Sequence, residues 1–191
     1  MGDDFVAWVR EHGLWAKWAT PLSPAQIDGI EHRLDLKLPP DYVRFLMTLH
    51  GIEMQWNASV LYNWLSEEKA IVDMMSWPTE GIVFDVEHNA LWHDSWGERP
   101  DTAAERSAIV QGLATRAPRL IPLSSHRFLV AQPCEADNIV LSVYQSDIIP
   151  WAATLRDFLI SVFTCKSPDN RAAYQAWSEA APIPFWGDLT S

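Results

Sequence analysis

The stretch LSPAQIDGIEHRLDLKLPPDYVRFLMTLHG, residues 22–51, decides most of the fold prediction, because helix signals and apolar stripes occur in it together. Ser23, Pro24 and Gln26 have the spacing of an N-cap, a first helical residue and the partner that completes a capping box. The apolar stripe that follows is Ile27, Ile30 and Leu34. The sequence therefore predicts an amphipathic helix that starts at Ser23.

The second half of the stretch predicts another helix after a forced extended turn. Leu38-Pro39-Pro40 keeps the chain extended, because a residue before proline avoids the α region. The carboxylate of Asp41 favours the positive end of the helix over 41–50 that follows. Its core side is expected to be Tyr42, Phe45, Leu46 and Leu49, with Gly51 as the C-terminal cap. These roles are structural, so we expect no catalysis from this motif.

Outward from this stretch, the chain is expected to be helical first, then rich in strands, then helical again. The predicted helices are 4–18, 65–75 before the stop at Trp77-Pro78, 102–116 with Asp101 as cap, one starting near Pro150, and a short one after the Ser167-Pro168 cap. The predicted strands are 81–87, 120–123, 127–132 and 138–145, while 52–62 is ambiguous and the tail 181–191 irregular. This order favours an α+β fold, a mostly antiparallel twisted sheet flanked by N-terminal and C-terminal helices.

Composition limits the class of protein. With 191 residues, 48% of them apolar, and eleven tryptophans, the chain suits one globular domain over 1–191, with a core over about 22–165. No signal peptide and no run long enough for a membrane span are found, so we expect a cytoplasmic protein. Cys134 and Cys165 lack metal-ligand spacing, and we expect them to be reduced and buried. No histidine at 12, 32 or 50 is expected to be more than a surface or cap residue.

The net charge of −11 bears on partners. An acidic surface repels phosphate backbones, so nucleic-acid binding is not expected. A basic protein partner would be steered toward this chain. An alternative is that the acidity serves solubility alone.

The 22–51 stretch resembles the N-terminal signature of the SUKH superfamily, which includes Smi/Knr-like cell-wall assembly regulators and many bacterial immunity proteins. The matching residues are Leu38, Pro39, Asp41, Tyr42, Phe45, Leu46 and Gly51, and His50 stands where the family often has Asn. Three later blocks resemble a bacterial branch: FDVEHNALWHDSWGERP (84–100), RLIPLSSHRFLVAQP (119–133) and NIVLSVYQSDIIPWAATLRDFL (138–159). Pro150-Trp151 departs from the Tyr-Gly expected there. The resemblance implies a SUKH-like fold and a non-enzymatic, immunity-like protein that neutralises a toxin domain by direct binding.

Catalytic chemistry has weaker support in the sequence. Glu87, His88, His93 and Asp94 could hold a metal only if one loop folded back on itself, and their spacing is no established ligand pattern. A hydrolase using His93, Asp94 and His126 with a nearby serine remains an alternative, although no nucleophile elbow is present. No glycine-rich phosphate loop is found either. We expect no cofactor and no metal.

Partner binding is the preferred interpretation of the loop 89–101. Tryptophan and arginine are favoured interface anchors. The candidate partner-binding residues are Trp92, His93, Asp94, Trp96, Arg99, His126, Arg127, Glu53 and Glu87. Two alternatives stay open: Trp92 and Trp96 could fill the core while Arg99 pairs with Asp101 or Glu98, and the same loop could bind a small ligand or peptide in a regulatory protein.

Overall fold

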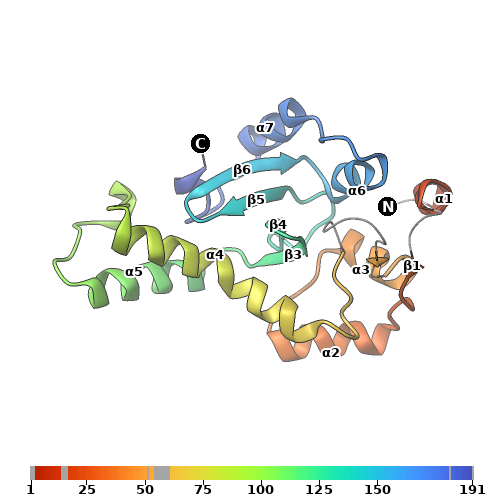
Figure 1. The fold of residues 1–191 in the computed structure, drawn as a ribbon, viewed down its shortest axis with the longest axis horizontal. Coiled ribbons are helices and arrows are strands. Elements are labelled where there is room, and N and C mark those ends of the chain that lie inside the picture. Colours follow the sequence, from red (N-terminus) through yellow and green to blue (C-terminus); the bar gives the residue numbers. More distant parts are fainter. Residues whose placement is uncertain (1–2, 14–16, 51, 54–60, 181, 191) are drawn as a thin grey trace.

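A computed structural model describes residues 3–13, 17–50, 52–53, 61–180 and 182–190 (Figure 1), apart from the side chains of residues 3, 52 and 53. The helices are α1 (Asp3–His12), α2 (Pro24–Leu34), α3 (Pro40–Thr48), α4 (Glu68–His88), α5 (Ala103–Arg116), α6 (Leu155–Thr164) and α7 (Asn170–Glu179), with 3-10 turns η1 (Asp94–Trp96) and η2 (Gly187–Leu189). The strands are β1 (Lys17–Trp18), β2 (Ile52–Glu53), β3 (Leu120–Ser124), β4 (Arg127–Val130), β5 (Val140–Tyr144) and β6 (Asp147–Ala152). The predicted α+β class is confirmed.

The centre of the fold is an antiparallel sheet in the order β3-β4-β5-β6. Side chains alternate between its two faces, and both faces are buried. On β4, for example, Leu129 belongs to one core cluster, whereas Phe128 and Val130 belong to the other. A second, two-stranded antiparallel sheet joins β1 to β2.

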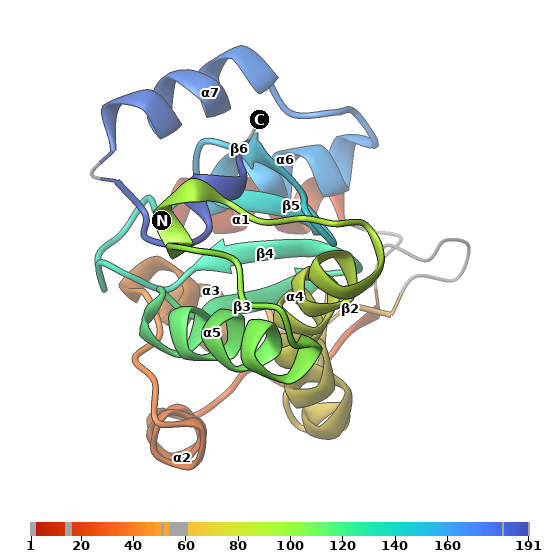
Figure 2. The same cartoon turned by 90° about the vertical axis from the view of Figure 1, so that its left-hand side faces the viewer.

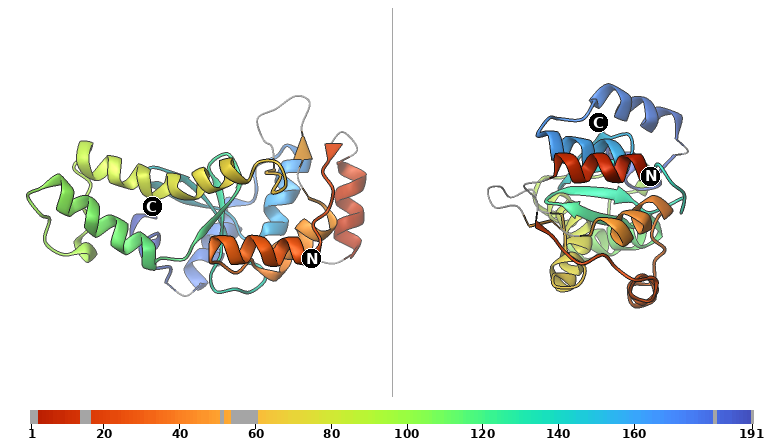
Figure 3. Two further views of the ribbon diagram at one scale, coloured as in Figure 1. Left: turned by 90° about the horizontal axis from the view of Figure 1, so that it is seen from below. Right: turned by 90° about the vertical axis from the view of Figure 1, so that its right-hand side faces the viewer.

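The helices cover the sheet from opposite sides. The cluster around Leu129 takes its other side chains mainly from α1, α2, α3 and α6, and the cluster around Phe128 takes them from α4, α5 and the C-terminal tail. Figures 1 and 3 show α1 and α6 packed together at one end, while the α4–α5 pair extends at the opposite end. Figure 2 shows α7 above β6, which it contacts. None of the helices that the structure describes combines the length and apolar character needed to cross a bilayer.

The 22–51 stretch folds largely as its sequence predicts. Ser23 and Gln26 form the complete capping box of α2, and Ile27 and Ile30 are buried. The helix ends at Asp35 in the left-handed conformation. Pro40 is the first residue of α3, whose buried side chains include Tyr42, Phe45 and Leu46. Gly51, the predicted cap, lies outside the described residues.

The prediction for His50 was wrong, because this residue is fully buried. Its Nε2 accepts a hydrogen bond from the backbone N–H of Trp64 (2.9 Å). Since that nitrogen must then be unprotonated, the proton is on Nδ1, which donates to the carbonyl of Thr20 (2.8 Å). The imidazole thus ties three chain segments together, and burial lowers its pKa.

The largest error concerns residues 65–88. A stop at Trp77-Pro78 and a strand over 81–87 were expected, yet α4 is one helix from Glu68 to His88 with Pro78 inside it. Its buried side chains recur at helical spacing: Ile71, Pro78, Ile82, Asp85 and Val86. Proline inside a helix costs roughly 3 kcal/mol, and burial of this stripe against the sheet offsets that cost.

The first predicted helix was too long. It was expected over 4–18, but α1 ends at His12, and Lys17 and Trp18 form β1. Gly13 follows α1, where a Cβ would lie only 2.8 Å from the carbonyl oxygen of Val9. Pairing of Trp18 with Ile52 then takes the chain into the small sheet.

The helix expected to start near Pro150 was also misplaced. Pro150 lies in β6 beside a register shift, and α6 starts later, with Thr154 as its cap. A proline without an N–H is tolerated at such an edge strand.

Smaller corrections concern caps and thiols. Thr102, one residue after the predicted Asp101, caps α5, and Asp169 caps α7 in place of Ser167. Cys134 and Cys165 are free but exposed, contrary to the burial that was expected. The tail contains η2 and a bridge from Thr190 to Ile148.

Candidate functional site

The loop 89–101 joins α4 to α5, and its Trp96 packs against the C-terminal tail. Trp96 is 7% exposed. Its ring centroid lies 5.5 Å from that of Trp92, edge to face, and 5.7 Å from that of Phe185, stacked. Trp92 is half-buried and donates from Nε1 to the carbonyl of Gly97 (2.7 Å). Trp96 is therefore a core residue, whereas Trp92 keeps part of its surface exposed.

The polar residues of this loop do not have the geometry of a catalytic triad. Ser95 Oγ lies 2.7 Å from Asp188 Oδ2, to which it donates, and 2.8 Å from His93 Nδ1. The backbone nitrogen of Ser95 also lies 3.2 Å from Nδ1. A triad needs the carboxylate on the histidine, which it orients. Here the carboxylate holds the serine instead.

The structure does not bring the predicted hydrolase residues together. Among the described residues, no hydrogen bond or ion pair joins His93 or Asp94 to His126. The charges that influence the pKa of His126 are those of Arg127 and Asp147. In the described part of the chain, no three histidine, cysteine or carboxylate side chains gather as a metal site would require.

The remaining predicted loop residues tie the loop to its helices. Arg99 donates from Nη2 to the carbonyl of Val86 (3.1 Å) instead of pairing with Asp101 or Glu98. Glu87 on α4 is exposed and accepts a hydrogen bond from Ser107 Oγ of α5 (2.5 Å). The side chain of Glu53 lies outside the described residues, so its predicted role stays a prediction.

His126 and Arg127 lie elsewhere, where the β3–β4 and β5–β6 turns meet α4. Three side chains form what we call the hairpin-end surface: Trp77, His126 and Tyr144. Arg127 and Trp151 lie next to it on the face of the sheet that carries the Leu129 cluster, whereas Trp77 stacks on Phe128 of the opposite cluster. Tyr144 is 58% exposed, and its ring contacts Trp77 and His126 edge to face, with centroids 5.6 and 6.4 Å away. An exposed tyrosine held upright by two rings offers a rigid contact to another molecule.

Asp85 fixes α4 to this end of the sheet. The residue is buried and accepts hydrogen bonds from the backbone N–H (2.9 Å) and the hydroxyl (2.6 Å) of Ser146 in the β5–β6 turn. A third bond comes from Asn89 Nδ2 (2.6 Å). Gly81, one turn earlier, permits close packing, because a Cβ there would lie 3.0 Å from Gln145 Cα. These contacts place Trp77 beside Tyr144.

Arg127 lies next to this surface and is half-buried. As the first residue of β4 it pairs with Ser142 of β5, whose hydroxyl accepts from its Nη1 (2.6 Å). Its guanidinium lies over the ring of Trp151, 3.6 Å from the centroid. Burial lowers the pKa of Arg127 to about 10. Burial also lowers the pKa of His126, with a further contribution from the charge of Arg127, while Asp147 acts in the opposite direction.

The sequence identified only two of these five residues. The sequence does not indicate Trp77, because Trp77-Pro78 predicts a helix stop, and it does not indicate Trp151, because Pro150 predicts a helix start. Tyr144 is the last residue of a correctly predicted strand and the one exposed residue in it, and its position at the turn into β6 is the signal that could have marked it as exposed.

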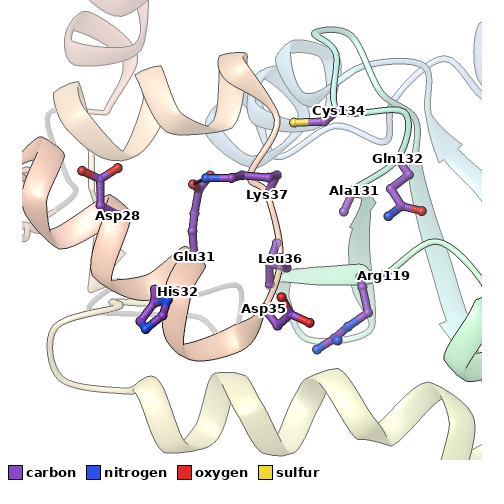
Figure 4. Close-up of a pocket in the computed structure, with 10 residues that line it drawn as sticks. All are labelled: Asp28, Glu31, His32, Asp35, Leu36, Lys37, Arg119, Ala131, Gln132 and Cys134. Atoms are coloured by element: carbon purple, nitrogen blue, oxygen red, sulfur yellow. Dashed lines mark hydrogen bonds and ion pairs between the residues drawn. The ribbon is translucent and has the colours of Figure 1, made fainter.

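A separate open pocket of about 760 Å³ lies between α2 and the end of β4. Figure 4 shows Glu31 and Lys37 extended toward one another across it, joined by an ion pair, with Asp28 and His32 on the α2 side. Asp35 and Arg119 approach each other at its far end, and Cys134 lies at the rim. Positive and negative groups thus partly compensate each other there.

Comparisons of this chain with protein-family models, with curated proteins and with solved structures found no match in any of the three.

Proposed function

We propose that the chain is a non-enzymatic protein-binding domain, an immunity-like protein of the SUKH kind that neutralises a toxin domain by direct binding. The observation that carries this proposal is the hairpin-end surface, where the exposed Tyr144 packs against Trp77 and His126. Tyrosine and tryptophan are among the residues that dominate the binding energy of protein interfaces. An exposed tyrosine held between two rings supports a protein partner.

The charge of the chain supports a basic partner. With 25 acidic against 14 basic residues, the protein attracts a positively charged domain over a distance and increases its association rate. Exposed carboxylates on α4, including Glu80 and Glu87, lie on the helix that borders the hairpin-end surface. A toxic nuclease presents a basic surface of this type. We place this interaction in the cytoplasm, where the exposed cysteines stay reduced.

The test is co-expression with toxin domains encoded beside this gene. We expect the wild-type protein to rescue growth and to bind one such domain in calorimetry. Tyr144→Ala is expected to weaken binding by about tenfold or more, as for a hot-spot residue. Tyr174→Ala is the matched control, since Tyr174 is a 41% exposed tyrosine on α7.

Circular dichroism of both variants serves as the control that their folding is intact. Absence of rescue and of binding with every neighbouring domain would contradict the proposal. Equal losses from the two substitutions would contradict the choice of surface.

A second candidate is a regulatory protein that binds a small ligand or peptide, and the open pocket of about 760 Å³ favours it. Carboxylates and Arg119 line this pocket together. Such a lining suits a zwitterionic peptide more than an apolar ligand. A thermal-shift screen with short peptides tests this function. A ligand that stabilises the wild type but not an Arg119→Ala variant supports it, and no shift across the set removes it.

A further inference from the structure

Arg127 is half-buried without an acidic partner among the described residues. Its one hydrogen bond goes to the neutral hydroxyl of Ser142, and its plane rests on Trp151. A guanidinium has five N–H donors, so most of its donors remain available. The chain has 25 carboxylate side chains, and none of those that the structure describes pairs with this partly desolvated cation.

The surroundings hold this guanidinium in one orientation. Stacking on Trp151 fixes the plane, and the bond to Ser142 fixes the rotation within that plane. Both partners belong to the central sheet, because Ser142 is on β5 and Trp151 on β6. A fork oriented in advance loses little entropy when it binds a second planar group, which is the basis of tight bidentate recognition.

We propose that Arg127 is a carboxylate-binding subsite next to the hairpin-end surface, which receives the side chain of an Asp or Glu from the partner protein. This assignment rests on the proposed function, because it names what the partner presents beside that surface. The carboxylate and the guanidinium lie in one plane and share two parallel N–H···O bonds, as in other arginine–carboxylate pairs.

A carboxylate suits the site better than a phosphate. His126 is the neighbouring basic side chain, and burial together with the charge of Arg127 lowers its pKa, so it is largely neutral near pH 7. A phosphate dianion would therefore meet one cation here, in a chain whose net charge is −11. A monoanion is matched by Arg127 alone.

The experiment titrates the isolated full-length protein and follows the Nε–Hε resonance of Arg127 by NMR, assigned by its absence in Arg127→Lys. The probes are a blocked Gly-Glu-Gly peptide, the matching Gly-Gln-Gly peptide, a blocked Gly-Gly with a free C-terminus, and acetate, phosphate and chloride at equal ionic strength. We expect a saturable millimolar shift with the Glu peptide and acetate, and none with the Gln peptide or chloride.

Matched variants separate the effect of the planar guanidinium from that of its positive charge. Arg127→Lys keeps the charge but loses the planar fork, and Trp indole resonances are expected to show at least about fivefold weaker binding of the Glu peptide. Arg156→Gln is the control, because Arg156 also stacks on a ring, that of Phe5, but is exposed on α6. Its substitution should leave binding unchanged.

Three outcomes would overturn the inference: no saturable shift with the Glu peptide, an equal shift with chloride, or tighter binding of phosphate. If the Gly-Gly peptide with a free C-terminus binds and the blocked Glu peptide does not, the bound carboxylate comes from a chain terminus and not from an Asp or Glu side chain. Because no toxin domain takes part, this failure is distinct from a failure of the rescue assay. Rescue without carboxylate binding leaves the proposed function in place, and carboxylate binding without rescue leaves the subsite.

Discussion

Replacement of His50 tests the two hydrogen bonds that this buried imidazole makes to Thr20 and Trp64. His50→Leu fills a similar space but removes the acceptor for the N–H of Trp64 and the donor for the carbonyl of Thr20. The N–H of Trp64 is buried, so losing its partner costs roughly 1–3 kcal/mol, whereas the carbonyl of Thr20 is only partly buried and costs about 1 kcal/mol. We expect a loss of about 3 kcal/mol in the free energy of unfolding.

The assay is urea unfolding followed by tryptophan fluorescence. A loss of that size lowers the midpoint by about 1–2 M urea for a protein of this size. The control is His32→Leu, since His32 is exposed on α2. A His50→Leu midpoint within about 0.3 M of the wild type, or equal to that of the control, would refute the reasoning, because it would mean that neither hydrogen bond stabilises the fold.

The pH dependence gives a second, independent readout. Burial lowers the pKa of His50 in the folded protein, so below the unfolded value of about 6.5 the unfolded chain binds a proton that the folded protein does not. The contribution of neutral His50 is therefore complete above about pH 6.5 and is lost as the pH falls, by up to about 1.4 kcal/mol per pH unit. His50→Leu should flatten this part of the profile, and a parallel profile would contradict the assigned burial.

Three further predictions concern the hairpin-end surface and its supports. Gly81→Ala should destabilise the protein by about 1–3 kcal/mol in thermal unfolding, because the new Cβ meets Gln145 at 3.0 Å, whereas Gly112→Ala, with open space at its Cβ, should stabilise it by up to about 1 kcal/mol. Asp85→Ala should cost about 3 kcal/mol by leaving the Ser146 and Asn89 donors without their acceptor, and a change below about 1 kcal/mol would show that the β5–β6 turn does not depend on it. Arg127→Gln should raise the pKa of His126 in an NMR titration, since it removes a positive charge that lowers it, and a lowered pKa would contradict this electrostatic assignment.

The local sequence predicted elements well where its signals agreed with each other. Ser23 and Gln26 form the expected capping box, and the three apolar runs near 120, 127 and 140 are strands of one antiparallel sheet. Prediction failed where a residue with a strong local preference is overridden by packing. Pro78 lies inside α4 because the apolar stripe around it is buried on the sheet, and Pro150 lies in a strand because β6 is at the sheet edge.

The candidate site was predictable only in part for the same reason. The sequence indicates His126 and Arg127 as two basic residues between two strands, but the residues that define their environment come from distant segments. Trp77 reaches Tyr144 only because α4 continues through Pro78, and Trp151 reaches Arg127 only because β6 continues through Pro150. Each missed partner follows directly from a misplaced element boundary.

The sequence by itself determined the α+β class, the start of α2 and three of the four strands of the central sheet, because caps, turns and runs of apolar residues act over a few neighbouring positions. The tertiary structure alone decided that His50 is buried, that Trp96 belongs to the core, and that Ser95 bonds to Asp188 rather than entering a triad. Those outcomes depend on which distant surfaces meet, and burial against a distant segment changes both the pKa and the partners of a side chain. Arg127 shows both effects, since the pairing of β4 with β5, and of β5 with β6, turns one basic residue into an oriented, partly desolvated cation.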